Sequence, residues 1–165
     1  MFNLLGPLAN PAGVKRQLLG VYDKRWLVPM AEALRDLGCE HALVICGQDG
    51  MDEITTTTGT DVAELRDGAI TTYVVTPEDA GITRATEADL KGGDPAYNAA
   101  AILRLLEGEA GAFRDIVLLN AGAALILSGQ ARTLAEGAKL AAAAIDDGRA
   151  RTALARMAAI SRGEA

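Results

Sequence analysis

One apolar run of strand length, residues 42–46, limits the possible folds of this sequence more than any other segment. An uninterrupted run of this kind is typical of a strand that is buried on both faces of a parallel sheet. A second strand is predicted at 17–22. Between the two, apolar residues recur at helical spacing, with Asp23 as a suitable N-cap and Gly38 as a suitable stop for a helix to about Leu37. Strand, helix and strand in this order predict a βαβ unit.

The segment after this unit predicts an antiparallel hairpin. Residues 62–65 and 70–75 are rich in β-forming residues, and the four residues between them include Gly68, which suits a hairpin turn. The sequence has no internal repeat and no linker long enough to divide it. We therefore expect one α/β domain with a mixed sheet flanked by helices.

The second half of the sequence is predicted to be helical. Asp94 followed by Pro95 provides an N-cap and a first-turn proline for a helix to about Leu106. The run 117–119 could form a strand in isolation, but its Ala-rich continuation favours a buried helix. Three further helices, separated by Gly129 and Gly148, are expected near residues 112–128, 133–147 and 149–160.

Composition and charge exclude several classes of protein. Hydrophobic residues make up 50% and charged residues 23% of the chain, as in ordinary soluble domains. The net charge of -6 disfavours nucleic acid and anionic membranes as partners. No apolar run approaches the roughly 18 residues of a membrane helix, and the first residues lack the charged leader of a signal peptide. Any phosphate-bearing ligand must then be held by a local device such as a metal ion.

The two cysteines, Cys39 and Cys46, lie seven residues apart and lack the CxxC spacing of a zinc ribbon or a redox motif. This usage argues against a disulfide framework and predicts a reducing, cytoplasmic location. His41 lies between them, so a Cys/His metal site is one interpretation. We favour the other, in which both cysteines are small buried residues flanking a strand.

The segment that follows the apolar run is rich in carboxylates. Asp49, Asp52 and Glu53 lie just past the strand's C-terminal end, where ligands collect in open α/β sheets. Adjacent carboxylates diverge on a regular element, so Asp52 and Glu53 can serve one site only from an irregular loop, which Gly50 permits. Carboxylates without His or Cys suit magnesium, whose shell is completed by water and substrate phosphates. A solvated acidic turn is the alternative.

Two segments resemble motifs of the anthranilate phosphoribosyltransferases. Residues 2–11 are similar to that family's FN-x-LGPL-x-NP signature, and residues 49–53 are similar to its DG-x-DE metal motif. The similarity covers essentially the whole chain in the family's order and spacing. Further matching segments are Gly92-Gly93-Asp94, Asn98-Ala99, residues 114–121 and residues 137–148.

The resemblance implies a pentosyl transfer, the second step of tryptophan biosynthesis. The amine of anthranilate would attack the anomeric carbon of 5-phosphoribosyl-1-pyrophosphate, and pyrophosphate would leave. Asp52 and Glu53 would bind Mg2+, which takes up charge on the leaving group. Gly6 and Pro7 would contact the aromatic substrate, although a plain structural turn is the alternative for this pair. No residue of this chain is assigned as catalytic, and the family forms homodimers.

The sequence also departs from the family pattern. The family's GTGGD glycine loop, its Lys-His-Gly-Asn segment and an anthranilate-contacting arginine precede the FN-x-LGPL signature and do not occur here. Gly92-Gly93-Asp94 resembles the glycine loop only superficially, because Pro95 makes it a helix-capping turn. Cys46 replaces a residue that is more often His in the family, which leaves both metal carboxylates intact.

These departures define what we expect of the chain. Residues 1–165 would be the C-terminal part of the catalytic α/β domain, without the N-terminal helical domain and the first part of the α/β domain, and inactive alone. A relative of the pyrimidine nucleoside phosphorylases and a non-catalytic remnant are the alternatives. Since the family's preceding chain adds strands to the same sheet, strands 17–22 and 42–46 should lack some neighbours, which predicts marginal stability and self-association.

Overall fold

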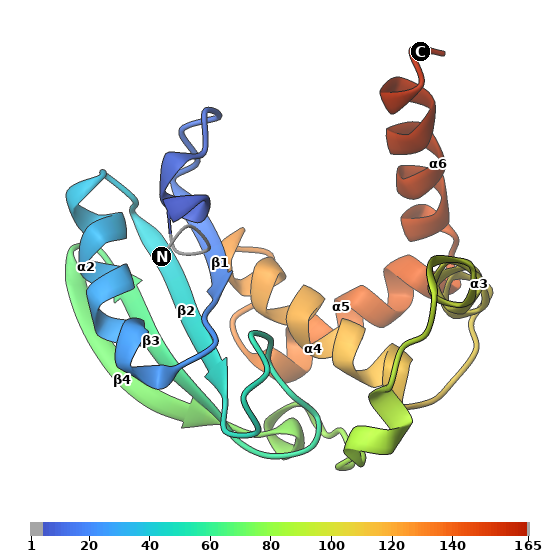
Figure 1. The fold of residues 1–165 in the computed structure, drawn as a ribbon, viewed down its shortest axis with the longest axis horizontal. Coiled ribbons are helices and arrows are strands. Elements are labelled where there is room, and N and C mark those ends of the chain that lie inside the picture. The colour runs from blue at the N-terminus through green and yellow to red at the C-terminus, as the bar shows by residue number, and fades with distance from the viewer. Residues whose placement is uncertain (1–4, 165) are drawn as a thin grey trace.

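The computed structural model describes residues 5–164, which form a mixed four-stranded sheet and a helical half (Figure 1). The strands lie in the order β1-β2-β3-β4. β1 pairs with β2 in parallel, whereas β2–β3 and β3–β4 are antiparallel. The predicted mixed α/β sheet, its βαβ unit and its antiparallel hairpin are therefore confirmed. The strand bounds are β1 Arg16–Gly20, β2 His41–Gly47, β3 Thr60–Arg66 and β4 Ala69–Val75.

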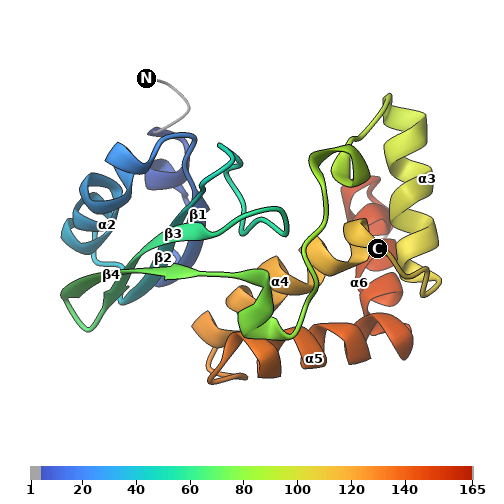
Figure 2. The same cartoon turned by 90° about the horizontal axis from the view of Figure 1, so that it is seen from below.

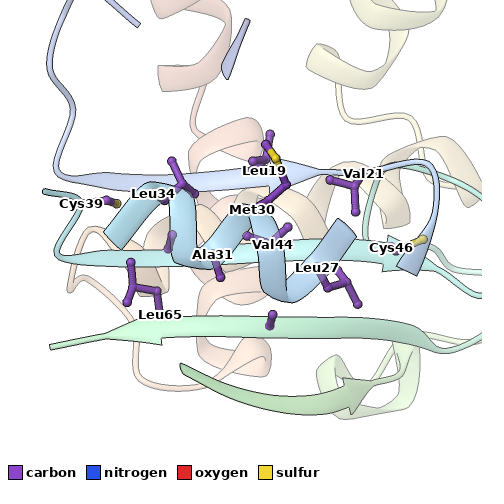
Figure 3. Close-up of a cluster of buried hydrophobic side chains, with 12 residues drawn as sticks. Leu19, Val21, Leu27, Met30, Ala31, Leu34, Cys39, Val44, Cys46 and Leu65 are labelled. Carbon is purple, nitrogen blue, oxygen red and sulfur yellow. The ribbon is translucent and has the colours of Figure 1, made fainter. Parts of the chain in front are cut away.

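The connection between β1 and β2 covers one face of the sheet. Asp23 caps it as predicted, accepting a hydrogen bond from the Arg25 backbone N–H at 3.0 Å. The single helix predicted here consists of two elements, a 3-10 turn, η2 (Lys24–Trp26), followed by α2 (Leu27–Asp36). Gly38 ends the connection with a positive φ of 85°. Figure 3 shows the resulting apolar layer, to which α2 contributes its buried face, Leu27, Met30, Ala31 and Leu34.

The β3–β4 hairpin turns through Asp67 and Gly68. Both have a positive φ, 50° and 83°, which is the backbone of a two-residue turn that matches the strand twist. The β3 ladder runs from Thr60 opposite Gly47 to Arg66 opposite His41, so β3 begins two residues earlier than predicted. The reason is that Thr60 and Asp61 extend the pairing to the very end of β2.

The second half of the chain is helical, as predicted, and residues 117–119 lie in a helix. α4 packs on the face of the sheet opposite α2, where Leu119 and Ala123 meet Ile45 and Val62. α5 runs beside α4, and Leu134 at its start packs against the same apolar cluster, whereas α3 and α6 lie farther from the sheet (Figure 2). The helix bounds are α3 Pro95–Leu106, α4 Ala112–Leu127, α5 Leu134–Asp146 and α6 Arg149–Ser161, with short 3-10 turns η1 Pro7–Ala9, η3 Pro77–Ala80 and η4 Glu87–Leu90.

Two glycines bring α4 and α5 into backbone contact. A Cβ added at Gly122 would lie 2.8 Å from the Ala138 nitrogen, and one added at Gly137 would overlap the Gly122 carbonyl oxygen. We expect Gly137→Ala to lower the free energy of unfolding by about 1–3 kcal/mol through overpacking. Helix propensity alone would raise it by up to about 1 kcal/mol, so the sign is informative. Urea unfolding measures this value, and an unchanged or higher stability would contradict the close contact.

The prediction about missing strand neighbours is partly wrong. β2 has a partner on each side, β1 and β3, because the hairpin supplies a strand that the sequence pattern did not assign to it. β1 does lie at one edge of the four-stranded sheet, and only Leu19 among its residues is buried. None of the helices in the described range 5–164 is long and apolar enough to cross a membrane.

Candidate metal and substrate site

Asp52 and Glu53 lie in the irregular loop that joins β2 to β3, at the C-terminal ends of the parallel strands β1 and β2. Gly50 has a φ of 91°, as the prediction of an irregular loop requires. Gly20 at the end of β1 allows the loop to approach this strand closely, since a Cβ there would overlap the Asp52 carbonyl oxygen. The Asp52 backbone therefore rests directly on the end of β1, at the edge of the sheet where the sequence predicted a ligand site.

Asp49 organises the loop. One carboxylate oxygen accepts hydrogen bonds from the hydroxyls of Thr55, at 2.6 Å, and Thr57, and the other accepts from the Met51 backbone N–H at 3.1 Å. Burial opposes ionisation of this carboxyl, but the hydrogen bonds from Thr55 and Thr57 outweigh burial and hold its pKa below the usual value. Because its oxygens already bond the loop, Asp49 is the least suited of the three carboxylates to bind a metal.

The Asp52 and Glu53 side chains are exposed. No hydrogen bond or ion pair within residues 5–164 engages either carboxylate. Desolvation by nearby protein atoms raises the pKa of the Glu53 carboxyl, and the Asp52 charge adds to the rise. Two adjacent carboxylates without a protein cation fit a divalent ion, which would relieve their repulsion. In the described part of the chain, no cluster of three or more His, Cys, Asp or Glu could enclose a metal, so water and phosphate would complete its shell.

Asn120 on α4 holds the residue that follows this pair. Its side-chain oxygen accepts a hydrogen bond from the Ile54 backbone N–H, and its Nδ2 donates to the Ile54 carbonyl, both at 2.9 Å. Nδ2 also donates to the Ile116 carbonyl at 2.9 Å. The sequence prediction missed this residue. The available signal was one amide side chain within the otherwise apolar stretch of α4.

An open hollow of about 570 Å3 adjoins the acidic loop. It lies between the loop and η4, and Lys91 is the cationic residue in its lining. Asp49 and Glu87 are acidic residues of the same lining, so an anionic ligand there would depend on a bound metal cation as well as on Lys91. The lining residues are Asp49, Gly50, Met51, Glu87, Ala88, Leu90 and Lys91.

The structure does not bring Gly6 and Pro7 to the carboxylates. The Pro7 carbonyl accepts a hydrogen bond from Gln17 Nε2 at 3.3 Å, near the start of β1, whereas Asp52 rests on the end of that strand. Gly6 is exposed, and a Cβ added to it would meet nothing within 4 Å. The first residues of the same motif, Phe2 and Asn3, lie outside the described residues.

The remaining motifs have structural roles. Cys39 and Cys46 are buried in the apolar layer under α2, so the preferred interpretation is confirmed, and burial raises the pKa of both thiols. His41 pairs instead with Glu64 at 2.9 Å. The capping turn at 92–94 is also confirmed, since Asp94 accepts a hydrogen bond from the Tyr97 N–H at 2.8 Å.

Comparison with known proteins identifies a family. A model described as "Glycosyl transferase family, a/b domain" matches residues 1–151. The anthranilate phosphoribosyltransferase of Maricaulis maris (strain MCS10) is 74% identical over 165 residues, which are 100% of this chain and 49% of that relative. The chain therefore spans about half the length of the curated relatives that it matches.

Solved structures are similar over the same extent. Anthranilate phosphoribosyltransferase (TrpD) from Thermus thermophilus has a TM-score of 0.88 at 44% identity, and the match covers 98% of this chain and 47% of that one. The enzyme from Saccharomyces cerevisiae in complex with PRPP and Mg has a TM-score of 0.85 at 26% identity, over 93% of this chain and 44% of that one.

Proposed function

This chain belongs to the glycosyl transferase family that the a/b-domain model describes, and we propose that it supplies part of the active site of an anthranilate phosphoribosyltransferase. The observation that carries the proposal is the exposed Asp52–Glu53 pair at the C-terminal edge of the sheet, in a chain 74% identical to an enzyme of that name. The names of the relatives favour this activity over that of a pyrimidine nucleoside phosphorylase.

The proposed substrates are 5-phosphoribosyl-1-pyrophosphate and anthranilate, and the proposed cofactor is Mg2+. A yeast relative has been solved with PRPP and Mg, which supports both donor and metal. A bound Mg2+ would stabilise negative charge on the departing pyrophosphate. In this proposal Asp52 and Glu53 would supply carboxylate oxygens to the metal, and Lys91, which lines the hollow beside Asp49, Gly50 and Met51, would supply a positive charge to the donor.

The proposal also covers the place of this chain within a larger enzyme. Residues 1–165 would form the C-terminal part of the catalytic α/β domain, with Gly6 and Pro7 toward the anthranilate. Full-length relatives are about twice as long, which is consistent with a donor-binding half contributed by other chain segments. We propose a cytoplasmic enzyme that is homodimeric like its family and binds neither nucleic acid nor membrane.

Metal binding tests the proposal directly. We expect the chain to bind Mg2+ weakly alone and more tightly with the donor present, because two carboxylates leave most of the coordination shell to water and phosphate. The Asp52→Asn, Glu53→Gln double variant should lose at least the roughly 10–100-fold in affinity that outer-shell partners of a metal contribute. Calorimetric titration of Mg2+, with and without donor, measures this loss.

The control for this experiment is an Asp36→Asn, Glu40→Gln double variant. It changes the net charge equally, and both residues are exposed and lie at or beyond the C-terminal end of α2, before β2 begins. It should bind as the unchanged chain does. Equal binding by the Asp52–Glu53 double variant would remove the metal assignment.

A further inference from the structure

We infer that Asn120 is a positioning residue that holds the Asp52–Glu53 pair in its metal-binding geometry, an inference that rests on the proposed function of that pair. The starting observation is that the two carboxylates have no partner of their own among residues 5–164. Their orientation must therefore come from the backbone that carries them. Asn120 is the side chain that ties this backbone to a helix.

The hydrogen bonds of Asn120 define one arrangement. Its amide accepts from the Ile54 N–H and donates to the Ile54 carbonyl, so it satisfies both backbone groups of one residue, 66 positions away in sequence. The second hydrogen of Nδ2 goes to the Ile116 carbonyl one turn earlier on α4. A flipped amide would place an NH2 group against the Ile54 N–H and an oxygen against two carbonyls, so the network fixes the assignment.

The hydrogen bonds between Asn120 and Ile54 act next to the carboxylates. Ile54 follows Glu53 directly, and its side chain is 2% exposed in the apolar cluster that includes Leu119 of α4. Within the pair itself, the Asp52 carbonyl, which belongs to the peptide bond between Asp52 and Glu53, rests against Gly20. The backbone of the pair is thus held by a steric contact at the peptide bond that joins its two residues and by the Asn120 hydrogen bonds to the residue after it. Metal affinity depends on how well such supporting contacts hold the ligands.

A merely structural role for Asn120 makes a different prediction, and the chain offers a matched control. Asn98 on α3 makes the same two-way bond to another backbone residue, accepting from the Gly93 N–H at 2.9 Å and donating to the Gly93 carbonyl at 3.0 Å. Gly93 does not adjoin the carboxylate pair in sequence. Removal of either amide costs hydrogen bonds, but only the loss of Asn120 should change metal binding.

The test compares three single variants, Asn120→Ala, Asn120→Asp and Asn98→Ala, with the unchanged chain. The probes are Mn2+ alone and Mn2+ with inorganic pyrophosphate, and free Mn2+ is read by electron paramagnetic resonance below each variant's melting transition. We expect Asn120→Ala to weaken Mn2+ binding about tenfold or more and Asn98→Ala to leave it unchanged. Asn120→Asp keeps the shape but loses both donated bonds, while its charge alone would strengthen cation binding. A weaker affinity for this variant therefore reports lost geometry.

The outcomes separate this inference from the function on which it rests. If the Asp52→Asn, Glu53→Gln variant binds Mn2+ as the unchanged chain does, the metal site itself fails. If that variant loses binding while both Asn120 variants keep it, the site stands and the positioning role is overturned. The role is also overturned if Asn98→Ala weakens binding equally, or if neither Asn120 variant folds, since Asn120 would then be a residue of the fold.

Discussion

The 165-residue chain alone is expected to form no measurable phosphoribosyl-anthranilate from the donor and anthranilate. The sequence has no GTGGD loop to hold the phosphates through backbone N–H groups. The residues proposed to reach the donor are two carboxylates and Lys91, which leave the reacting carbon unpositioned. Positioning lowers the activation barrier of favourable intramolecular reactions by roughly 7–11 kcal/mol. Without it, the reaction should be too slow to detect. Product formation can be followed by chromatography with mass detection, with a full-length relative as the positive control.

Addition of a complementing fragment provides a second test of this expectation. Co-expression with the N-terminal half of a full-length relative should restore activity, and the Asp52→Asn, Glu53→Gln variant should not be restored. Sedimentation of the chain with and without that fragment tests the expected self-association through the β1 edge. Turnover by the purified chain alone, above the level of its double variant, would mean that residues assigned here to structure hold the donor.

The elements of the fold could be predicted because their signals are local. Asp23, Asp94 and Gly38 stop or start helices through bonds to neighbouring residues, and the apolar run at 42–46 has the length of a strand. The antiparallel partner of β2 could not be predicted, because its pairing with β3 depends on a register that no periodicity encodes. The same limit explains the expectation that β2 lacks neighbours.

Of the candidate site, the sequence predicted only the proposed metal ligands. Asp52 and Glu53 were identified through their spacing and their resemblance to a motif. The contacts that shape their loop join distant segments: Asn120 to Ile54 across 66 positions, and Gly20 to Asp52 across the end of a strand. The structural role of Asp49 could not be predicted either, because the hydroxyls that donate hydrogen bonds to its carboxylate belong to threonines further along the same loop.

Among glycine-to-alanine substitutions in this chain, Gly20→Ala is expected to have the largest effect on stability. The new Cβ would overlap the carbonyl oxygen of Asp52, and its next neighbours are the carbonyl carbon at 2.6 Å and the Asp52 Cβ at 3.0 Å. Backbone atoms cannot rotate away as a flexible side chain can, so either β1 or the loop must shift. We expect a loss of about 3 kcal/mol or more, the upper end of the cost of overpacking.

The same substitution links the fold to the metal site. A shift of the loop would displace Asp52 while leaving both carboxylates in the sequence, so Mn2+ affinity should fall together with stability. Gly6→Ala is the stability control, because its Cβ meets nothing within 4 Å and its φ of -53° suits alanine. Urea unfolding and Mn2+ titration of both variants measure the two effects. If Gly20→Ala unfolds at the same urea concentration as the unchanged chain, the loop does not rest on β1, and the Asn120 hydrogen bonds to Ile54 are the one support of the carboxylate pair that remains among those described above.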